Sequence, residues 1–430
     1  PTPTATSTSG HLLPPGYLHT QGAQIVDATN NPVRLAGVNW YGFDCNSYVA
    51  GGLDHQPLSY VCQQIKNLGF NVIRLPVSVD VVQNNPAITS YLDANPSLSG
   101  LTALQIMDRL IQTAGSYGLK VILDNHRSEA GWSEESNGLW YTQSYPESVW
   151  ISTWQTIVQR YATNSTVIGC DLRNEPGAPP PDSTAWPQNN GSEWGYSDPA
   201  YNTTTYPDNW ATAAQKAGNA ILGVNSNLLI FVEGVRYDPA GPIFNGSNYL
   251  YWPGGNLMGV GNAGGYRLVP VQISLNVANR LVYSIHDYGP DLYSGLAWCQ
   301  LDSNGNGTGA TPSACDGVWD QTWGYIAKNG IAPIWVGEFG TVNGYKPNDS
   351  TPRQDYTDIN SDYVAQGYWF TYLVNYIKNN NLNWCYWALN GTQSLAPGRD
   401  PSTADWYGVL DPTWSTAASQ PMMTKLQSIQ

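Results

Sequence analysis

Short apolar runs rich in β-branched and aromatic residues recur along the chain, and most are followed by a segment with helical spacing of its apolar positions. Eight of these runs have the length of buried strands: 33–40, 71–77, 120–126, 167–176, 227–234, 280–289, 332–341 and 383–391. Such nearly continuous hydrophobicity is typical of parallel strands that are covered on both faces.

Helical spacing lies between most of the strands, in five segments: 57–69, 101–118, 147–162, 209–224 and 364–380. The first two end at glycine, which is the usual residue just past a helix C-terminus. Eight strands that alternate with helices predict an α/β fold, a single closed (β/α)8 barrel of the TIM type. A doubly wound open sheet is the alternative, but such a sheet rarely contains eight strands.

The segments outside this repeat predict the organisation of the chain. Residues 1–16 are rich in Pro, Thr and Ser, the composition of an O-glycosylated linker, and we expect a further module upstream of it. Residues 17–32 predict a short hairpin at the bottom of the barrel, and 17–430 are predicted to form one domain. Long polar insertions follow strands four to six, on the face where barrel enzymes build their sites: roughly 177–208, 235–279 and 287–320.

The surface is poor in charge, since only 12% of the residues are charged and the formal net charge is -14. A chain without a basic patch cannot neutralise phosphates, so no nucleic-acid partner is expected. The chain has 18 Trp and 28 Tyr but only 6 Phe. Trp and Tyr combine a flat apolar face with a hydrogen-bonding edge, which suits the CH face and the hydroxyls of a sugar ring. Some of these rings we expect to be core residues instead.

The composition also indicates where the protein works. No apolar run approaches the roughly 20 residues that span a bilayer, so no membrane segment is expected. Seven N-x-S/T sequons begin at Asn164, Asn190, Asn202, Asn245, Asn306, Asn348 and Asn390. Together with the mucin-like linker, they favour a secreted extracellular glycoprotein, which we expect to be a monomer.

The chain has six cysteines, at positions 45, 62, 170, 299, 315 and 385. Their spacing favours Cys45–Cys62 and Cys299–Cys315 as disulfides that close short loops, among the fifteen pairings that six cysteines allow. The other two lie inside apolar runs and fit equally well as buried thiols. No CxxC or Cys/His spacing indicates zinc.

In a barrel, side chains at the carboxyl ends of different strands converge on one cleft. In strand order, the side chains at these ends are Asn39 and Trp40, Arg74, His126, Asn174 and Glu175, Glu233, His286 and Tyr288, Glu338, and Trp387. The set combines carboxylates with histidines, an arginine and aromatic rings.

Two of these carboxylates, Glu175 and Glu338, can face each other across the barrel mouth. A carboxyl pair roughly 5 Å apart is the apparatus of retaining glycoside hydrolysis, in which one group attacks the anomeric carbon and the other protonates the leaving oxygen. Glu233 is the strongest competitor, but it fits equally well as a partner of barrel-top backbone. Asp124 is expected to pair with the histidine two residues on, and Asp287 to point away from the cleft.

Four short motifs carry a family resemblance: "IRLPV" on strand two, "RNEP" after strand four, "HDY" on strand six and "GEFG" on strand seven. In this order, with "VRLAGVNWYGF" and "LLIFVEGV", they resemble glycoside hydrolase family five, and within it the secreted endo-β-1,4-glucanases. The resemblance covers about residues 17 to 415. It implies a (β/α)8 cellulase that cleaves β-1,4-glucosidic bonds by double displacement through a covalent glycosyl-enzyme, without a cofactor.

The resemblance implies a role for each polar site residue. Glu175 would be the general acid/base and Glu338 the nucleophile. Arg74 and Tyr288 would keep Glu338 ionised and aimed, and Asn174 would bind the 2-hydroxyl of the reacting sugar.

Further residues would serve the substrate, a β-glucan polysaccharide or oligosaccharide. His126 and His286 would bind its hydroxyls and steady the acid/base network. Trp387 would be the stacking floor under the reacting sugar, and Trp40 and Trp252 platforms further along the cleft. A carbohydrate-binding module is the module that the resemblance suggests upstream of the linker.

Departures from the family pattern leave the substrate open. Leu389 stands where relatives often carry another Trp, which puts one platform in doubt. The long insertions suit exo action as an alternative, and mannan, mixed-linkage glucan or xyloglucan would suit the same mechanism. A catalytically inactive sugar-binding barrel is disfavoured because both carboxylates are present.

A stretch beginning at Asp302 matches the first half of a calcium loop, with Asn304 and Asn306 at alternate positions. Position twelve is Ser313 rather than glutamate. We therefore expect a loop without a metal there, and no metal in the proposed chemistry.

Overall fold

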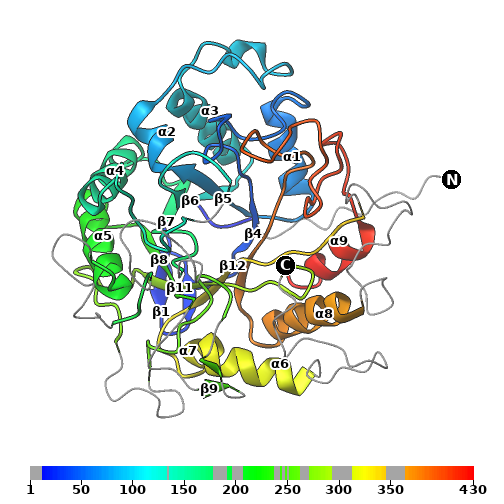
Figure 1. Cartoon of the computed structure of the whole chain (residues 1–430). Helices are drawn as coiled ribbons and strands as arrows, with labels where there is room; N and C mark the ends of the chain where they lie inside the picture. The colour runs from blue at the N-terminus through cyan, green and yellow to red at the C-terminus, as the bar shows by residue number, and fades with distance from the viewer. Residues whose placement is uncertain are drawn as a thin grey trace.

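The computed structural model describes residues 12–132, 135–177, 191–195, 207–236, 243–244, 247–248, 251–261, 271–292, 312–344 and 364–430. Eight parallel strands close into a barrel in the order β11-β12-β13-β4-β5-β6-β7-β8, and Figure 1 labels most of them. They are β4 (Ala36–Asn39), β5 (Val72–Ser78), β6 (Lys120–Arg127), β7 (Val167–Asp171), β8 (Leu229–Glu233), β11 (Leu281–His286), β12 (Ile334–Glu338) and β13 (Asn383–Tyr386). The predicted (β/α)8 barrel is confirmed, and the open sheet is excluded.

Helices surround the barrel (Figure 1), and each of the five predicted helical segments contains one. These are α1 (Leu58–Asn67), α3 (Ala103–Ser116), α4 (Glu147–Arg160), α5 (Trp210–Val224) and α8 (Val364–Asn379). The shorter elements are α2 (Val79–Asn84), η1 (Pro96–Leu98), α6 (Pro312–Trp319), the π-helical turn η4 (Asp320–Gly324), α7 (Tyr325–Lys328) and α9 (Gln420–Gln427). None of the helices in the described ranges has the length and apolar character needed to cross a membrane.

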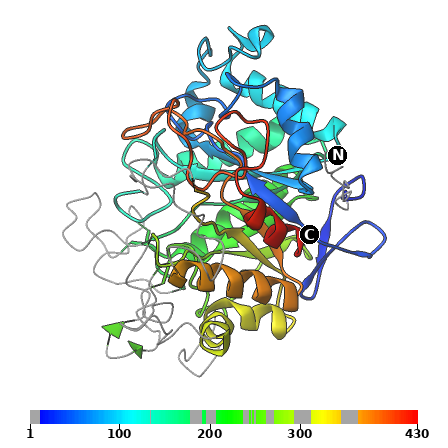
Figure 2. The ribbon, with the colours of Figure 1, turned by 90° about the vertical axis from the view of Figure 1, so that its right-hand side faces the viewer.

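An antiparallel sheet lies at the amino ends of the barrel strands, to the right in Figure 2. The segment predicted as a hairpin, 17–32, contains β1 (His19–Gln21) and β2 (Gln24–Val26) and leads into a third strand, β3 (Pro32–Val33). Arg280, which directly precedes β11, donates to the carbonyl of Leu18 at 2.8 Å, so the sheet is fixed to the bottom of the barrel. A further antiparallel pair is formed by β9 (Ile243–Phe244) and β10 (Ser247–Asn248).

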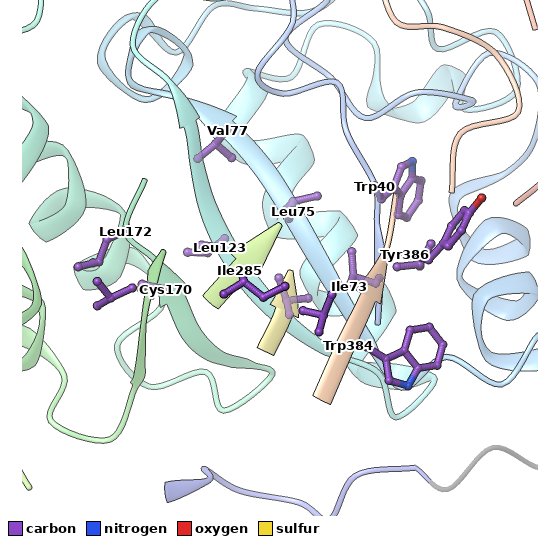
Figure 3. Packing of buried hydrophobic residues seen from close by; sticks show 14 of the residues in the cluster. Trp40, Ile73, Leu75, Val77, Leu123, Cys170, Leu172, Ile285, Trp384 and Tyr386 are labelled. Carbon is purple, nitrogen blue, oxygen red and sulfur yellow. The ribbon is translucent and has the colours of Figure 1, made fainter. Parts of the chain in front are cut away.

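Side chains on the barrel strands alternate between two environments, as expected of the two-residue period of a strand. On β5, Ile73, Leu75 and Val77 pack toward the helices (Figure 3), whereas Val72 joins the cluster inside the barrel. That interior cluster includes Ile122, Leu229, Val282 and Trp335 from the neighbouring strands. Further along the same inward faces, apolar residues give way to the buried charged residues Arg74, Asp124, Glu233 and His286. The barrel therefore has an apolar floor and a charged upper layer.

Trp40 belongs to the core between barrel and helices (Figure 3), so its predicted role as a cleft platform is wrong. Its ring is fully buried, and its Nε1 donates to the carbonyl of Gly51 at 3.0 Å. The reason is strand alternation, because Asn39 points into the barrel and the next residue must point out. Trp384 lies in the core, as predicted.

The cysteines in the described ranges are buried free thiols, so the predicted Cys45–Cys62 disulfide is wrong. Cys62 lies on the buried face of α1, whereas Cys45 packs in a separate cluster beside the barrel mouth. Cys315 is also a free thiol, which contradicts its predicted bridge to Cys299, a residue outside the described ranges. Short sequence spacing could not show that Cys45 and Cys62 lie in separate clusters of the fold.

Some sequence predictions concern residues outside the described ranges. These are the first part of the linker (1–11), much of the three insertions, five of the sequons and the loop with Asp302, Asn304 and Asn306. Among the two described sequons, Asn390 is fully buried and donates to the carbonyl of Tyr41 at 3.2 Å. Asn390 therefore cannot carry a glycan in the folded protein.

Candidate active site

A cleft of about 400 Å³ opens at the carboxyl ends of the barrel strands. It is lined by His126, Arg127, Trp132, Glu135, Leu139, Arg173, Asn174, Glu175, Trp252, Tyr288, Leu292, Glu338, Trp387, Arg399, Asp405, Trp406 and Tyr407. Most of the predicted site residues are among them. Arg74 and His286 lie just beneath the cleft and are fully buried.

Glu175 and Glu338 face each other in this cleft. One carboxylate oxygen of each, together with one ring nitrogen of His286, forms a group whose atoms all lie within 4.8 Å of one another. Glu338 is the last residue of β12, and Glu175 follows β7 with a left-handed backbone, φ 49°. One oxygen of each carboxyl thus lies no more than 4.8 Å from the other, which fits the close pair, roughly 5 Å apart, of retaining glycosidases and is well short of the separation in inverting enzymes.

Glu338 is held by two donors. Arg74 Nη1 donates to its Oε1 at 2.7 Å, and the hydroxyl of Tyr288 donates to its Oε2 at 2.9 Å. Burial raises the pKa of Glu338 to about 7, and the positive charges of His286 and Arg74 oppose this rise. Both oxygens are thus fixed in position, as a nucleophile requires.

Glu175 has a different pair of donors on its side chain. Trp252 Nε1 donates to its Oε1 at 2.7 Å, and His286 Nδ1 lies 3.0 Å from the same oxygen. Burial raises the pKa of Glu175, but the hydrogen bond and charge of His286 and the hydrogen bond of Trp252 outweigh burial, so its pKa lies below the usual value. The two carboxyls of the pair therefore have unlike surroundings, which is how two acids are assigned two roles.

Arg74 is the centre of the charged layer. Its guanidinium contacts four carboxylates: Asp124 at 3.0 Å, Asp171 at 2.9 Å, Glu233 at 3.1 Å and Glu338 at 2.7 Å. It also donates to Asn39 at 2.9 Å and to Asn174 Oδ1 at 3.0 Å. Together these contacts occupy the whole guanidinium fork, so its orientation beneath Glu338 is fixed.

This layer contains two cationic side chains, Arg74 and His286, and five carboxyl groups including Glu175. Because the carboxyl groups outnumber the cations, some of the carboxyl groups keep their protons. Burial raises the pKa of Asp124 to about 6 and those of Asp171 and Glu233 to about 7. Burial lowers the pKa of His286, but the charges of Glu233 and Glu338 outweigh it and hold that pKa well above the usual value.

Two predictions about competing carboxylates are confirmed. Asp124 Oδ2 lies 2.6 Å from Nδ1 of His126, the histidine two residues on. Asp287 points away from the cleft, where it accepts from Trp319 at 2.6 Å and Trp369 at 2.9 Å. Glu233 accepts from the backbone N of Glu175 at 2.8 Å, which is the backbone partnership considered for it.

Aromatic rings form one wall of the cleft. The ring of Trp387 stacks on His126 at 5.2 Å between centroids and on Tyr41 at 5.3 Å. Sequence reasoning missed the next part of this wall, where the guanidinium of Arg399 lies 3.6 Å from the ring centroid of Trp132. Both residues lie in loops, and only the "GW" that follows strand three could have suggested Trp132.

The donors that could ligate a cation are those of the carboxyl pair. In the described part of the chain, Glu175, His286 and Glu338 bring three ligand atoms close enough to share one ion. Both oxygens of Glu338 already accept hydrogen bonds from Arg74 and Tyr288. This arrangement suits a carboxylate held for reaction with a substrate.

Comparison with known proteins agrees with this geometry. The family model for cellulase (glycosyl hydrolase family 5) matches residues 26–393. An endoglucanase of Paenibacillus polymyxa is 41% identical over 403 residues, which are 93% of this chain and 84% of that protein. The major extracellular endoglucanase of Xanthomonas campestris pv. campestris is 30% identical over 417 residues, 96% of this chain and 71% of that protein.

Solved structures give the same result. An endocellulase of the archaeon Pyrococcus horikoshii superposes with a TM-score of 0.76 at 29% identity, over 96% of this chain and 99% of that one. A variant of that endocellulase in complex with cellotetraose gives a TM-score of 0.75 at 30% identity, over 96% and 98%.

A (β/α)8 barrel with a closely spaced carboxyl pair in its cleft, and with endoglucanases among its relatives, defines this chain as a glycoside hydrolase. The chain belongs to the cellulase family, glycosyl hydrolase family 5.

Proposed function

We propose that the protein is a retaining endo-β-1,4-glucanase that hydrolyses cellulose and soluble β-1,4-glucans. The observation that carries the proposal is the carboxyl pair, in which one oxygen of each group lies within 4.8 Å of the other, in a cleft rich in aromatic rings. That spacing leaves no room for a water molecule to attack from the far side, so one carboxylate itself is the nucleophile.

In the first step, a carboxylate oxygen of Glu338 forms a bond to the anomeric carbon while the glycosidic bond breaks. Glu175 gives its proton to the departing oxygen, and a covalent glycosyl-enzyme results. In the second step, Glu175 takes a proton from water, the water oxygen bonds to the anomeric carbon, and Glu338 leaves as a carboxylate. Two inversions give net retention.

Binding of a sugar sets the proton on the correct carboxyl. Without substrate, the pKa of Glu338 is raised and that of Glu175 is lowered. The glycosidic oxygen accepts a hydrogen bond from protonated Glu175, and the positive charge that develops on the anomeric carbon stabilises ionised Glu338. Because the two carboxyls interact strongly, one proton moves between them as a property of the pair.

Other residues of the cleft bind the sugar chain. Trp387 gives a face for the reacting sugar, and Trp252 lies on the side of the acid/base, where the leaving sugar would sit. Asn174 accepts from Arg74 through its oxygen, which leaves its amide N–H groups for a sugar hydroxyl. His126 lines the cleft, whereas His286 is fully buried, so we assign His286 to support of Glu175 rather than to sugar contact.

We also propose that the enzyme is secreted and monomeric, and that residues 1–16 are a linker to a carbohydrate-binding module. The Pro/Thr/Ser composition of the linker and the extracellular relative support this assignment. Cellotetraose bound by the related endocellulase supports a cello-oligosaccharide as the ligand of the cleft.

Carboxymethylcellulose tests the proposal. We expect viscosity to fall early, before many reducing ends accumulate, because internal bonds are cut. The Glu338→Gln variant should lose activity by about 10⁴-fold or more, as nucleophile replacements do. Reducing ends that rise without a drop in viscosity would indicate exo action. Faster hydrolysis of glucomannan or xyloglucan would indicate another β-glycan.

A further inference from the structure

Glu233 is a buried carboxylate that the two-step reaction does not use. It is the last residue of β8, is fully buried, and is absent from the residues that line the cleft. A substrate therefore cannot touch it, yet each of its oxygens contacts part of the reaction machinery.

One oxygen of Glu233 binds two cations. Oε1 accepts from Arg74 Nη2 at 3.1 Å and lies 3.2 Å from His286 Nε2. Arg74 in turn donates to the nucleophile, and the other nitrogen of His286 contacts the acid/base. Arg74 therefore connects Glu233 to the nucleophile, and His286 connects it to the acid/base.

The second oxygen of Glu233 binds the acid/base directly. Oε2 accepts from the backbone N of Glu175 at 2.8 Å. Glu175 has a positive φ of 49°, a conformation that costs a non-glycine residue on the order of 1 kcal/mol or more and persists only where the surroundings fix it. The bond from Glu233 is a contact that can fix it.

The neighbouring loop leaves space for this carboxylate. Gly254 has φ +75°, and a Cβ at that position would meet Glu233 Oε2 at 2.2 Å and Cα of Glu175 at 3.3 Å. The glycine therefore allows the loop to close over the bond between Glu233 and Glu175.

We propose that Glu233 is a positioning residue, which orients the proton-transferring group of Glu175 through its backbone N–H and through His286. The proposal rests on the proposed double displacement. It predicts a defect specific to proton transfer, since Arg74 keeps three other carboxylate contacts without Glu233.

The Glu233→Gln variant tests this role. An amide has one oxygen and one nitrogen, so it cannot accept both from Arg74 Nη2, which meets Oε1, and from the backbone N of Glu175, which meets Oε2. Two substrates separate the steps: cellotetraose, whose leaving sugar needs a proton, and 2,4-dinitrophenyl β-cellobioside, whose leaving group does not. We expect kcat/KM for cellotetraose to fall by about 10²-fold, the contribution of general acid catalysis, and kcat/KM for the dinitrophenyl glycoside to fall only a few-fold.

Asp171→Asn is the matched control. Asp171 is an equally buried carboxylate that contacts Arg74 at 2.9 Å but, in the described part of the chain, forms no hydrogen bond or ion pair with Glu175 or His286. Any loss of activity in this control should be of the same proportion on both substrates. Active sites of every variant are counted with a 2-fluoro-glycoside that traps the nucleophile, so that misfolded protein does not enter the rates.

Equal losses on the two substrates for Glu233→Gln, or no loss on either, would overturn the proposal. If Glu233→Gln does not fold, the Gly254→Ala variant provides the test instead, because the added Cβ displaces the Glu233 carboxylate without removing its charge. The same selective loss supports the proposal, and an unchanged ratio of the two kcat/KM values refutes it. Failure of the wild-type protein to be trapped would instead refute the proposed function.

Discussion

Arg74 Nη1 donates to Glu338 Oε1 at 2.7 Å, so the proposed nucleophile rests on a guanidinium with no exposed surface. The same guanidinium contacts Asp124, Asp171 and Glu233, none of which reaches solvent. The cation that orients the nucleophile therefore also neutralises the interior of the barrel.

Replacing Arg74 should consequently damage both stability and activity. Arg74→Ala leaves buried carboxylates without a partner, which costs about 3–5 kcal/mol for a single broken buried pair. We expect urea denaturation to show a loss of at least that order, or no folded protein at all. A variant with unchanged unfolding free energy would contradict the view that this guanidinium holds the charged layer together.

Trp252 should set the pH range of the reaction. Its Nε1 hydrogen bond lowers the pKa of Glu175, so Trp252→Phe, which keeps an aromatic face, should raise that pKa. The acid must be protonated in the first step, so kcat/KM is lost as pH rises through its pKa. The basic limb of the pH profile of kcat/KM should therefore move to higher pH in the variant. A basic limb that stays in place, or moves down, would show that this hydrogen bond does not tune the acid/base.

Trp387 and Trp40, which were both predicted to contact the substrate, should behave differently on replacement. Trp387→Ala removes a ring that lines the cleft and should weaken cello-oligosaccharide binding about tenfold, from the loss of stacking worth ~1 kcal/mol or more. Trp40→Phe removes a buried hydrogen bond to Gly51 and should cost about 1–2 kcal/mol of unfolding free energy. KM for cellotetraose should be unchanged in Trp40→Phe, and a large rise there would restore the role as a platform.

Buried carboxyls should make the protein most stable in mildly acidic solution. Burial raises the pKa values of Asp287, Asp171 and Glu233 from their ordinary values to about 7. A raised carboxyl pKa means that the folded protein holds protons that the unfolded chain has released, so this stabilisation is lost as pH rises from about 4 to about 7. Below that window, Asp80 and Asp411, whose pKa values are lowered on folding, lose their contribution. Denaturant unfolding at a series of pH values should show a decline from about pH 5 to pH 7, and a steady rise over that interval would contradict this reading.

Much of the site could be predicted because barrel geometry converts sequence position into spatial position. Glu175 and Glu338 each follow an apolar run, and parallel strands bring such ends to one rim. Strand alternation also contained the answer for Trp40, because its neighbour Asn39 is the inward residue. The position of Trp40 directly after an inward-facing residue was therefore the sequence signal that it points outward.

Loops and pairings could not be predicted in the same way. The contact between Trp132 and Arg399 joins two loops whose paths are set by tertiary packing rather than by a local pattern. Sequence spacing favours the pairing of Cys45 with Cys62, but it does not show that Cys62, on the helix predicted over 57–69, faces a different cluster from Cys45. The carboxylate contacts of Arg74 likewise form only when the four strands that carry Asp124, Asp171, Glu233 and Glu338 have assembled beside its own strand.

The stereochemistry of the first products tests the central claim, that Glu175 and Glu338 act as acid/base and nucleophile in a double displacement. Proton NMR during hydrolysis of cellotetraose resolves the α and β anomeric signals before mutarotation equilibrates them. Retention predicts that the β anomer of the newly formed reducing end appears first and that the α signal grows later. Early appearance of the α anomer would mean inversion and would contradict the mechanism inferred from the spacing of the pair.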